Sequence, residues 1–137
     1  MTPRHPQGLP DLFIDRSLGR LQVPTLLRAA GLHVHTLAEV YGIPADEKVT
    51  DVEWLTRAGT EGWAVLMKDE RIRYRPAERA AVLTAKVQGF CLVKGNLRAA
   101  AMADIFISAI EDIATACQSP GPYLYAVSTT GLRRVEL

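Results

Sequence analysis

Cysteine and long apolar runs are both scarce in this sequence, and each absence excludes a class of protein. Cys91 and Cys117 are the two cysteines among 137 residues, and neither has a Cys or His nearby at the spacing of a metal site. We therefore expect free thiols in a reducing compartment rather than a disulfide framework or a zinc finger. No stretch approaches the roughly 18 consecutive apolar residues of a membrane span, and prolines interrupt the amino-terminal segment where a signal peptide needs an apolar run. The expectation is a cytoplasmic protein with no membrane partner.

The chain also lacks a strong net charge and the common signatures of nucleotide-binding or metal-binding proteins. Its 16 Lys and Arg residues offset 15 Asp and Glu residues, so the net charge of +1 indicates no particular partner. No GxGxxG fingerprint, P-loop or serine nucleophile elbow occurs, and the segment from Cys91 to Arg98 is one residue too long for a phosphatase loop. His33 and His35 alternate along a predicted strand without an adjacent Cys or Asp, so both are expected to be structural side chains.

Apolar residues make up 48% of the sequence, which is enough for one domain with a sizeable core. Residues 1–10 contain three prolines and a glycine, and we expect them to form a flexible leader before a single domain at 11–137. Strand and helix patterns alternate through that domain. This alternation predicts right-handed crossovers and an α/β fold with a mainly parallel central sheet between helical layers.

The predicted elements follow from hydrophobic period and from start and stop signals. Thr50 and Glu53 form a capping pattern at the start of one helix, Gly62 ends it, and Pro76 suits the first turn of the next. The last segment is predicted as a hairpin, or as a strand with a short tail. Strands are expected at residues 11–15, 32–37, 63–68, 89–93 and 123–128, helices ending near residue 30 and at 50–61, 76–86 and 102–117, and a polar loop at 38–49.

Two predicted strands end in an acidic residue. Asp15 closes the first strand, and Asp69 closes the apolar run that begins at Trp63. The carboxyl ends of parallel strands share one edge of a sheet, where open α/β folds bind ligands. Asp51 begins the helix that leads into the second of these strands, so folding could bring the three carboxylates together. Carboxylate oxygens suit Mg²⁺ and Mn²⁺, and a metal held there could activate water for phosphodiester hydrolysis.

Each acid also has a purely structural interpretation. Asp15 and Asp69 could end strands and start turns, and an acid at position 51 is favoured in a first helical turn whatever the function. Glu70 follows Asp69 and could support the site without binding the metal itself. Solvated positions are expected for Glu39, Asp46, Glu47 and Asp104.

Basic residues surround and follow Asp69. The cluster contains Lys68, Arg71, Arg73, Arg75 and Arg79, with Tyr74 interleaved. Lys and Arg bind phosphates, and an aromatic ring can stack on an unpaired base, so this cluster is interpreted as an RNA-binding rim. The alternative is a charged surface connection with no ligand.

With these residues placed, the chain resembles PIN and PIN-like nucleases over about residues 12–93, especially the short VapC-type toxins. FIDRSLG is similar to the opening strand of that family, and TDVEWLTRAGTEGWAVLMKDERI is similar to its segment in which an acid precedes a helix and a strand leads into a second acid. The resemblance implies a three-layer α/β/α PIN-like fold with metal ligands at Asp15, Asp51 and Asp69, and Ser17 as the partner of Asp15. It also implies an Mg²⁺- or Mn²⁺-dependent ribonuclease, often homodimeric and often neutralised by an antitoxin protein.

Three hypotheses follow. The first is a metal-dependent endoribonuclease that is the toxin of a type II toxin–antitoxin pair. The second is a catalytically weak or inactive PIN-like module that binds RNA or a protein, because Met67 stands where many relatives have Thr and Lys94-Gly95-Asn96 stands where many have a fourth acid. Asn96 is interpreted as a helix cap. The third is a receiver-like phosphoacceptor, which is disfavoured because no adjacent acid pair accompanies Asp15.

Overall fold

A six-stranded sheet forms the centre of the protein. The computed structural model describes residues 4–68, 70–93 and 96–137, and in these ranges the strand order is β2-β1-β3-β4-β5-β6. The first five strands of this order run parallel, and β6 pairs antiparallel with β5. The strands are β1 (Leu12–Ile14), β2 (Val34–Thr36), β3 (Ala64–Met67), β4 (Gln88–Leu92), β5 (Tyr123–Ser128) and β6 (Gly131–Val135).

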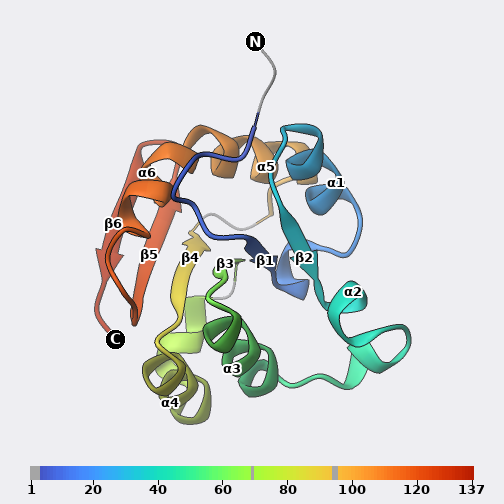
Figure 1. The fold of residues 1–137 in the computed structure, drawn as a ribbon, viewed down its shortest axis with the longest axis vertical. Helices are drawn as coiled ribbons and strands as arrows, with labels where there is room; N and C mark the ends of the chain where they lie inside the picture. Colours follow the sequence, from blue (N-terminus) through green and yellow to red (C-terminus); the bar gives the residue numbers. More distant parts are fainter. Residues whose placement is uncertain (1–3, 69, 94–95) are drawn as a thin grey trace.

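Helices cover both faces of this sheet, as Figure 1 shows. One layer contains α1 (Gln22–Ala29), α5 (Ala99–Ser108) and α6 (Ile110–Ala116), and the other contains α3 (Asp51–Glu61) and α4 (Pro76–Ala85). The short helix α2 (Leu37–Tyr41) follows β2 at the edge of the sheet. This arrangement confirms the three-layer α/β/α fold with a mainly parallel sheet.

Alternating strand residues supply two separate apolar clusters. Leu12 and Ile14 face the layer of α1, α5 and α6, whereas Phe13 faces α3 and α4, where it stacks on Trp54 with ring centroids 5.4 Å apart. All three strand residues are buried because helices cover both sides of a parallel strand. This double burial explains why β1 and β3 appear in the sequence as continuous apolar runs.

Local signals set the ends of α3 and α4 as predicted. The Thr50 hydroxyl accepts a hydrogen bond from the Glu53 N–H at 3.2 Å, and Gly62 ends α3 in the left-handed conformation with φ of +75°. Pro76 occupies the first turn of α4. The two helices pack closely at Gly59, where an added Cβ would lie 2.3 Å from the Ala85 carbonyl oxygen.

Two predicted elements differ from the structure. The polar loop predicted at residues 38–49 contains α2 and a 3₁₀ turn (Ala45–Lys48), because Thr36 and Glu39 form a reciprocal capping box that starts α2. The helix predicted at 102–117 begins earlier and divides into α5 and α6 at Ala109, whose N–H donates to the carbonyls of both Ile105 and Phe106. The predicted terminal hairpin is confirmed by β5 and β6.

The boundary between a leader at residues 1–10 and the domain at 11–137 stays a prediction. Residues 4–10 are described, and Leu9 is 7% exposed and belongs to the cluster beneath α1, α5 and α6. None of the helices in the described ranges has the length and hydropathy needed to cross a bilayer.

Candidate active site

Asp15 lies immediately after β1, at the edge of the sheet where the parallel strands end. The residue is only 3% exposed, and its N–H donates to the Leu66 carbonyl of β3 at 3.0 Å. Because Ile14 pairs with Leu66, the carboxyl ends of β1 and β3 lie side by side. The structure therefore places Asp15 at the edge predicted from its position at the tip of a strand.

Ser17 fixes the Asp15 carboxylate to the end of β3. The Ser17 hydroxyl donates to Asp15 Oδ2 at 2.6 Å and accepts from the Lys68 N–H at 2.9 Å. The Ser17 N–H also donates to the same carboxylate oxygen at 3.3 Å, so Asp15 caps the short 3₁₀ helix Arg16–Leu18. A residue two positions along the chain thus orients Asp15 and joins two strands that are distant in sequence.

The environment of Asp15 disfavours an isolated negative charge. Burial raises the pKa of the Asp15 carboxyl, and the nearby charge of Asp51 raises the same pKa further, while hydrogen bonds from Ser17 and the Arg16 backbone lower it. Asp15 Oδ1 is buried and has no hydrogen-bond partner among the described residues. Since a buried carboxylate oxygen normally has a partner, this oxygen is available to a cation.

Asp51 is at the first position of α3 and lies close enough to Asp15 to affect its titration. Its Oδ1 accepts a hydrogen bond from Trp54 Nε1 at 2.9 Å, which fixes the carboxylate to the core below α3. Its Oδ2 lies 3.6 Å from Arg75 Nη1. The helix dipole and Arg75 therefore both stabilise the negative charge of Asp51.

The third predicted ligand, Asp69, lies outside the described residues. The described residues resume at Glu70, where a 3₁₀ helix begins (Glu70–Tyr74). Lys68, directly before Asp69, is held beside Asp15 through Ser17. The described residues thus bring Asp15, Ser17 and Asp51 together, and the roles of Asp69 and of the Glu70 side chain stay predictions.

Comparisons with known proteins agree with this geometry. The family described as "PIN like domain" matches residues 10–94, a range that includes β1 to β4 and all three predicted acids. The chain belongs to the PIN-like family. It is also 37% identical over 127 residues to a Mycobacterium tuberculosis protein named "Putative ribonuclease VapC45", with 93% of this chain and 92% of the relative covered. No solved structure gives a significant match.

The basic residues of this PIN-like protein lie in several different environments. Lys68 is half-buried, Arg71 is exposed, and Arg75 pairs with Asp51. The Arg73 guanidinium lies over the Tyr74 ring at 4.6 Å from its centroid, and Arg73 Nε is buried. Of these four residues, Arg75 has a side-chain contact with one of the predicted acids, whereas Arg73 is partly buried against Tyr74.

Two positions that depart from the family pattern have structural roles. Met67 is fully buried and packs with the cluster beneath α3 and α4, so it gives the site no polar support. The interpretation of Asn96 as a helix cap is wrong, because Arg98 is the residue that precedes the first turn of α5. Asn96 instead adopts a left-handed conformation with φ of +57°, which asparagine tolerates.

A pocket beside Asp15 was not signalled by the sequence. It has a volume of about 330 Å³ and is lined by residues that include Arg16, Arg20 and Asp46. The prediction of a solvated Asp46 is wrong, because Asp46 is 7% exposed and its Oδ2 lies 2.5 Å from Arg20 Nη2. This pair joins the segment after the 3₁₀ helix Arg16–Leu18 to the 3₁₀ turn at Ala45–Lys48, and its members are 26 residues apart, so no local pattern could indicate it.

The residues at this edge suit a hard divalent cation. Asp15 offers a buried oxygen without a partner among the described residues, and Asp51 offers a second carboxylate in a half-buried position. All of the candidate ligands are carboxylate oxygens, which Mg²⁺ and Mn²⁺ prefer.

Proposed function

We propose that this protein is a metal-dependent endoribonuclease that hydrolyses RNA phosphodiester bonds and acts as the toxin of a type II toxin–antitoxin pair. The observation that carries the proposal is the buried, partly unsatisfied Asp15 carboxylate, which Ser17 fixes at the edge of the sheet beside Asp51. The folding of the core alone has no need for two interacting acids at this position. Membership of the PIN-like family and similarity to a protein with a ribonuclease name support the same activity.

In this proposal Asp15, Asp51 and Asp69 are the metal ligands. Mg²⁺ or Mn²⁺, when bound, supplies Lewis-acid chemistry at the scissile phosphate. Ser17 holds Asp15 in one orientation through its hydroxyl, and Glu70 supports the site from the residue after Asp69. Cation binding would also favour ionised Asp15, because a positive charge lowers the pKa that burial and Asp51 raise.

The proposed RNA-binding residues are Lys68, Arg71, Arg73 and Arg75. Their guanidinium and ammonium groups bind phosphates, and the Tyr74 ring, in a residue 68% exposed, offers a face for an unpaired base. Arg75 has a double role, since it pairs with Asp51 in this structure and is also close enough to the acids to reach a bound phosphate.

Cleavage of a mixed RNA pool tests the activity. Wild type, Asp15→Asn and Asp69→Asn are compared in Mn²⁺ and in EDTA. Because a metal site lowers the activation barrier by several kcal/mol, each variant should cleave at least about 10²-fold more slowly than wild type, and EDTA should stop cleavage. Asp104→Asn is the matched control, because Asp104 is an exposed acid on α5. Equal cleavage by wild type and Asp15→Asn would refute the proposal.

A non-catalytic PIN-like module is the second candidate, and the burial of Met67 favours it. Met67 supplies no polar atom where many relatives have a threonine. This candidate predicts no cleavage by wild type but RNA or protein binding that depends on the basic residues. Filter binding with Arg71→Ala distinguishes the two, since salt-dependent binding without cleavage supports the module.

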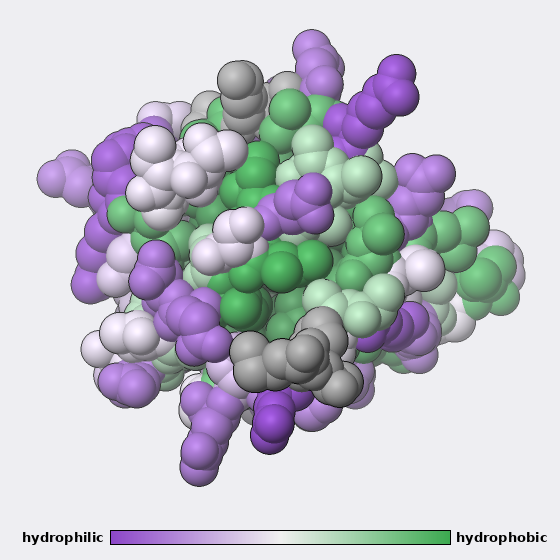
Figure 2. Space-filling view, turned by 90° about the horizontal axis from the view of Figure 1, so that it is seen from above, coloured by the Kyte–Doolittle hydropathy of each residue, from purple (hydrophilic) through white to green (hydrophobic). Residues whose placement is uncertain are grey.

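An antitoxin protein and a second copy of the chain are the proposed partners. Figure 2 shows the outer face of the layer containing α1, α5 and α6, with an apolar area surrounded by hydrophilic residues. Leu21 and Leu26 of this layer are 71% and 37% exposed. Light scattering of the purified chain, alone and with a coexpressed antitoxin, tests both partners. Leu21→Lys should weaken the association, whereas Gln22→Lys at the next exposed position should not.

A further inference from the structure

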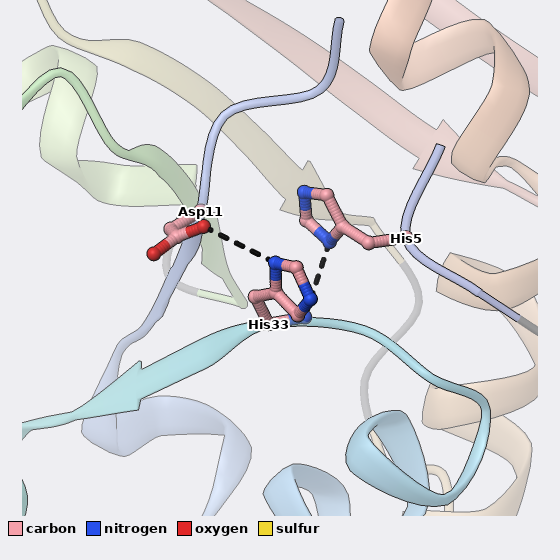
Figure 3. A group of neighbouring side chains, drawn as sticks. All are labelled: His5, Asp11 and His33. Carbon is pink, nitrogen blue, oxygen red and sulfur yellow. Dashed lines mark hydrogen bonds and ion pairs between the residues drawn. The ribbon is translucent and has the colours of Figure 1, made fainter. Parts of the chain in front are cut away.

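A second group of potential metal ligands lies at the opposite edge of the sheet. Asp11 directly precedes β1 and His33 directly precedes β2, so both lie where the parallel strands begin, away from Asp15. Figure 3 shows that His5, from the amino-terminal segment, completes a group with them. One ligand atom from each residue lies within 4.8 Å of the others, and this is the sole group of its kind in the described ranges.

The pairing of β1 with β2 places Asp11 beside His33. The Leu12 N–H donates to the His33 carbonyl at 2.9 Å, which fixes the two strand starts next to each other. Alternation along β2 puts His33 and His35 on the same face, and both side chains approach the Asp11 carboxylate. Asp11, His33 and His35 thus converge at the starts of β1 and β2 without any bound ion.

His5 reaches this group because the segment before β1 turns back on the sheet. A turn is closed by the Leu9 N–H and the Pro6 carbonyl at 3.2 Å, and the Leu9 side chain is anchored in the core. His5 Nε2 lies 2.9 Å from the Leu9 carbonyl and 3.1 Å from the Pro10 carbonyl. Since carbonyls only accept hydrogen bonds, Nε2 carries the proton and Nδ1 keeps the lone pair.

This arrangement of His5 matches that of a metal-binding histidine. Ligating histidines typically donate their other ring N–H to a carbonyl or carboxylate, which fixes the tautomer and the ring orientation. His5 Nδ1 points toward His33 and accepts from the His33 backbone N–H at 3.1 Å. The lone pair is therefore already directed into the group.

Asp11 is oriented in the same way by a residue behind it. His35 Nε2 lies 2.9 Å from Asp11 Oδ2, while Asp11 Oδ1 lies 3.5 Å from His33 Nδ1. The contact with His35 holds Oδ2 in place and leaves Oδ1 on the side of His33. The His35 ring is itself fixed by stacking on the Trp63 ring, with the ring centroids 4.3 Å apart.

We propose that His5, Asp11 and His33 form a binding site for a divalent transition metal such as Zn²⁺, which fastens residues 4–10 to the start of the sheet. Two imidazole nitrogens and one carboxylate oxygen are a ligand set that Zn²⁺ uses, with a fourth position left to water. The same set is poorly suited to Mg²⁺, which prefers oxygen ligands. The site is therefore chemically distinct from the carboxylates at Asp15 and Asp51.

Binding requires local changes at both histidines, because His5 Nδ1 must first release the hydrogen bond that it accepts from the His33 backbone N–H. The His5 and His33 rings are stacked in parallel, with centroids 4.3 Å apart and an angle of 4° between their planes. Stacked rings cannot both direct a lone pair at one ion, so His33 would rotate out of the stack. Its side chain is 65% exposed, which leaves room for this rotation. Zn²⁺ would replace the ring stack, the hydrogen bond to His5 Nδ1 and the contact between His33 and Asp11 with direct bonds to all three ligands.

Calorimetric titration of the full chain with Zn²⁺, in excess Mg²⁺ to occupy the carboxylate site, tests the proposal. We expect one equivalent of Zn²⁺ to bind. His5→Ala and His33→Ala should each weaken binding by about 100-fold or more, and His35→Ala by about tenfold through the loss of Asp11 orientation. The chain contains three histidines, all in this region, so imidazole NMR signals report the ligands directly.

Two matched control variants show whether Zn²⁺ binds to these three residues or elsewhere on the protein. Gln7→Ala changes an exposed residue of the same segment, and Asp15→Asn changes the opposite edge; both should bind Zn²⁺ like wild type. His33→Gln, at a mostly exposed side chain, guards against a folding defect and should also lose binding, with an unchanged circular dichroism spectrum. Wild-type affinity in His33→Ala or His33→Gln would overturn the proposal, and so would loss of Zn²⁺ binding in Asp15→Asn.

Discussion

Replacing Asp15 with asparagine should stabilise the protein without metal and destabilise it relative to wild type with metal. In EDTA at neutral pH, wild type must hold a buried carboxylate whose Oδ1 has no partner among the described residues and whose charge is opposed by Asp51. A buried polar group without a partner costs about 1–3 kcal/mol, and more when it is charged. Asparagine keeps a carbonyl that can accept from Ser17 but removes the charge.

The expected gain is about 1 kcal/mol, because the asparagine amide is itself still buried without a full set of partners. For a chain of this length, that gain raises Tm by roughly 3–5 °C. Mn²⁺ should instead favour wild type. An ion present at 100 times its Kd stabilises the native state by about 2.7 kcal/mol, and the variant binds the ion more weakly because it lacks the Asp15 carboxylate. The order of the two Tm values should therefore reverse between EDTA and Mn²⁺.

The pH dependence of stability in EDTA gives an independent check on the role of the buried Asp15 charge. Asp15 has a pKa raised above its ordinary value of 3.8, so its stabilising contribution is fully present below that value and is lost as pH rises through the raised pKa. The advantage of Asp15→Asn in EDTA should accordingly be smallest near pH 4 and should grow as pH rises, becoming constant once Asp15 is ionised. Scanning calorimetry of both proteins over this pH range measures the difference in stability. A wild type that is more stable than the variant in EDTA at pH 7, or a difference that does not change with pH, would refute this reasoning.

Three further substitutions test other parts of the structure. Ser17→Ala removes the hydroxyl that orients Asp15, so the free energy of unfolding, measured with urea in EDTA, should fall by about 1.5–3 kcal/mol. Mn²⁺ should stabilise this variant less than wild type, and an unchanged response to Mn²⁺ would contradict the role of the serine. Gly59→Ala places a Cβ 2.3 Å from the Ala85 carbonyl oxygen and should lower the free energy of unfolding by about 1–3 kcal/mol. An unchanged urea midpoint would mean that α3 and α4 can move apart at no cost. Tyr123→Phe removes hydroxyl bonds of 2.9 and 3.1 Å to two backbone carbonyls and should cost about 1 kcal/mol, with no change in RNA cleavage.

Most of the fold was predictable because its signals are local. Parallel strands covered on both faces need continuous apolar runs, and β1 and β3 both show them. The limits of α3 follow from Thr50 and Gly62, which act within a few residues of themselves. The division of α5 from α6 was not predictable, since the apolar spacing continues through Ala109 while its backbone tightens.

The candidate site shows the same division between local and distant contacts. The position of Asp15 could be predicted because a strand tip is visible in the sequence, and its bond to Ser17 because the resemblance to PIN-like nucleases implies it. The bond from Lys68 to Ser17 and the approach of Arg75 to Asp51 join residues far apart in the chain. Sequence therefore indicated which acids could matter, and folding decided which side chains support them.

By itself, the sequence determined the alternation of strands and helices, the acids at the strand tips and the membership of the PIN-like family. Tertiary structure alone decided that Asp46 is buried against Arg20 and that His5 and His33 meet Asp11. The physical reason is that periodicity and capping act over one or two turns of chain, whereas a cluster of ligands depends on strand pairing and on where a distant segment folds back.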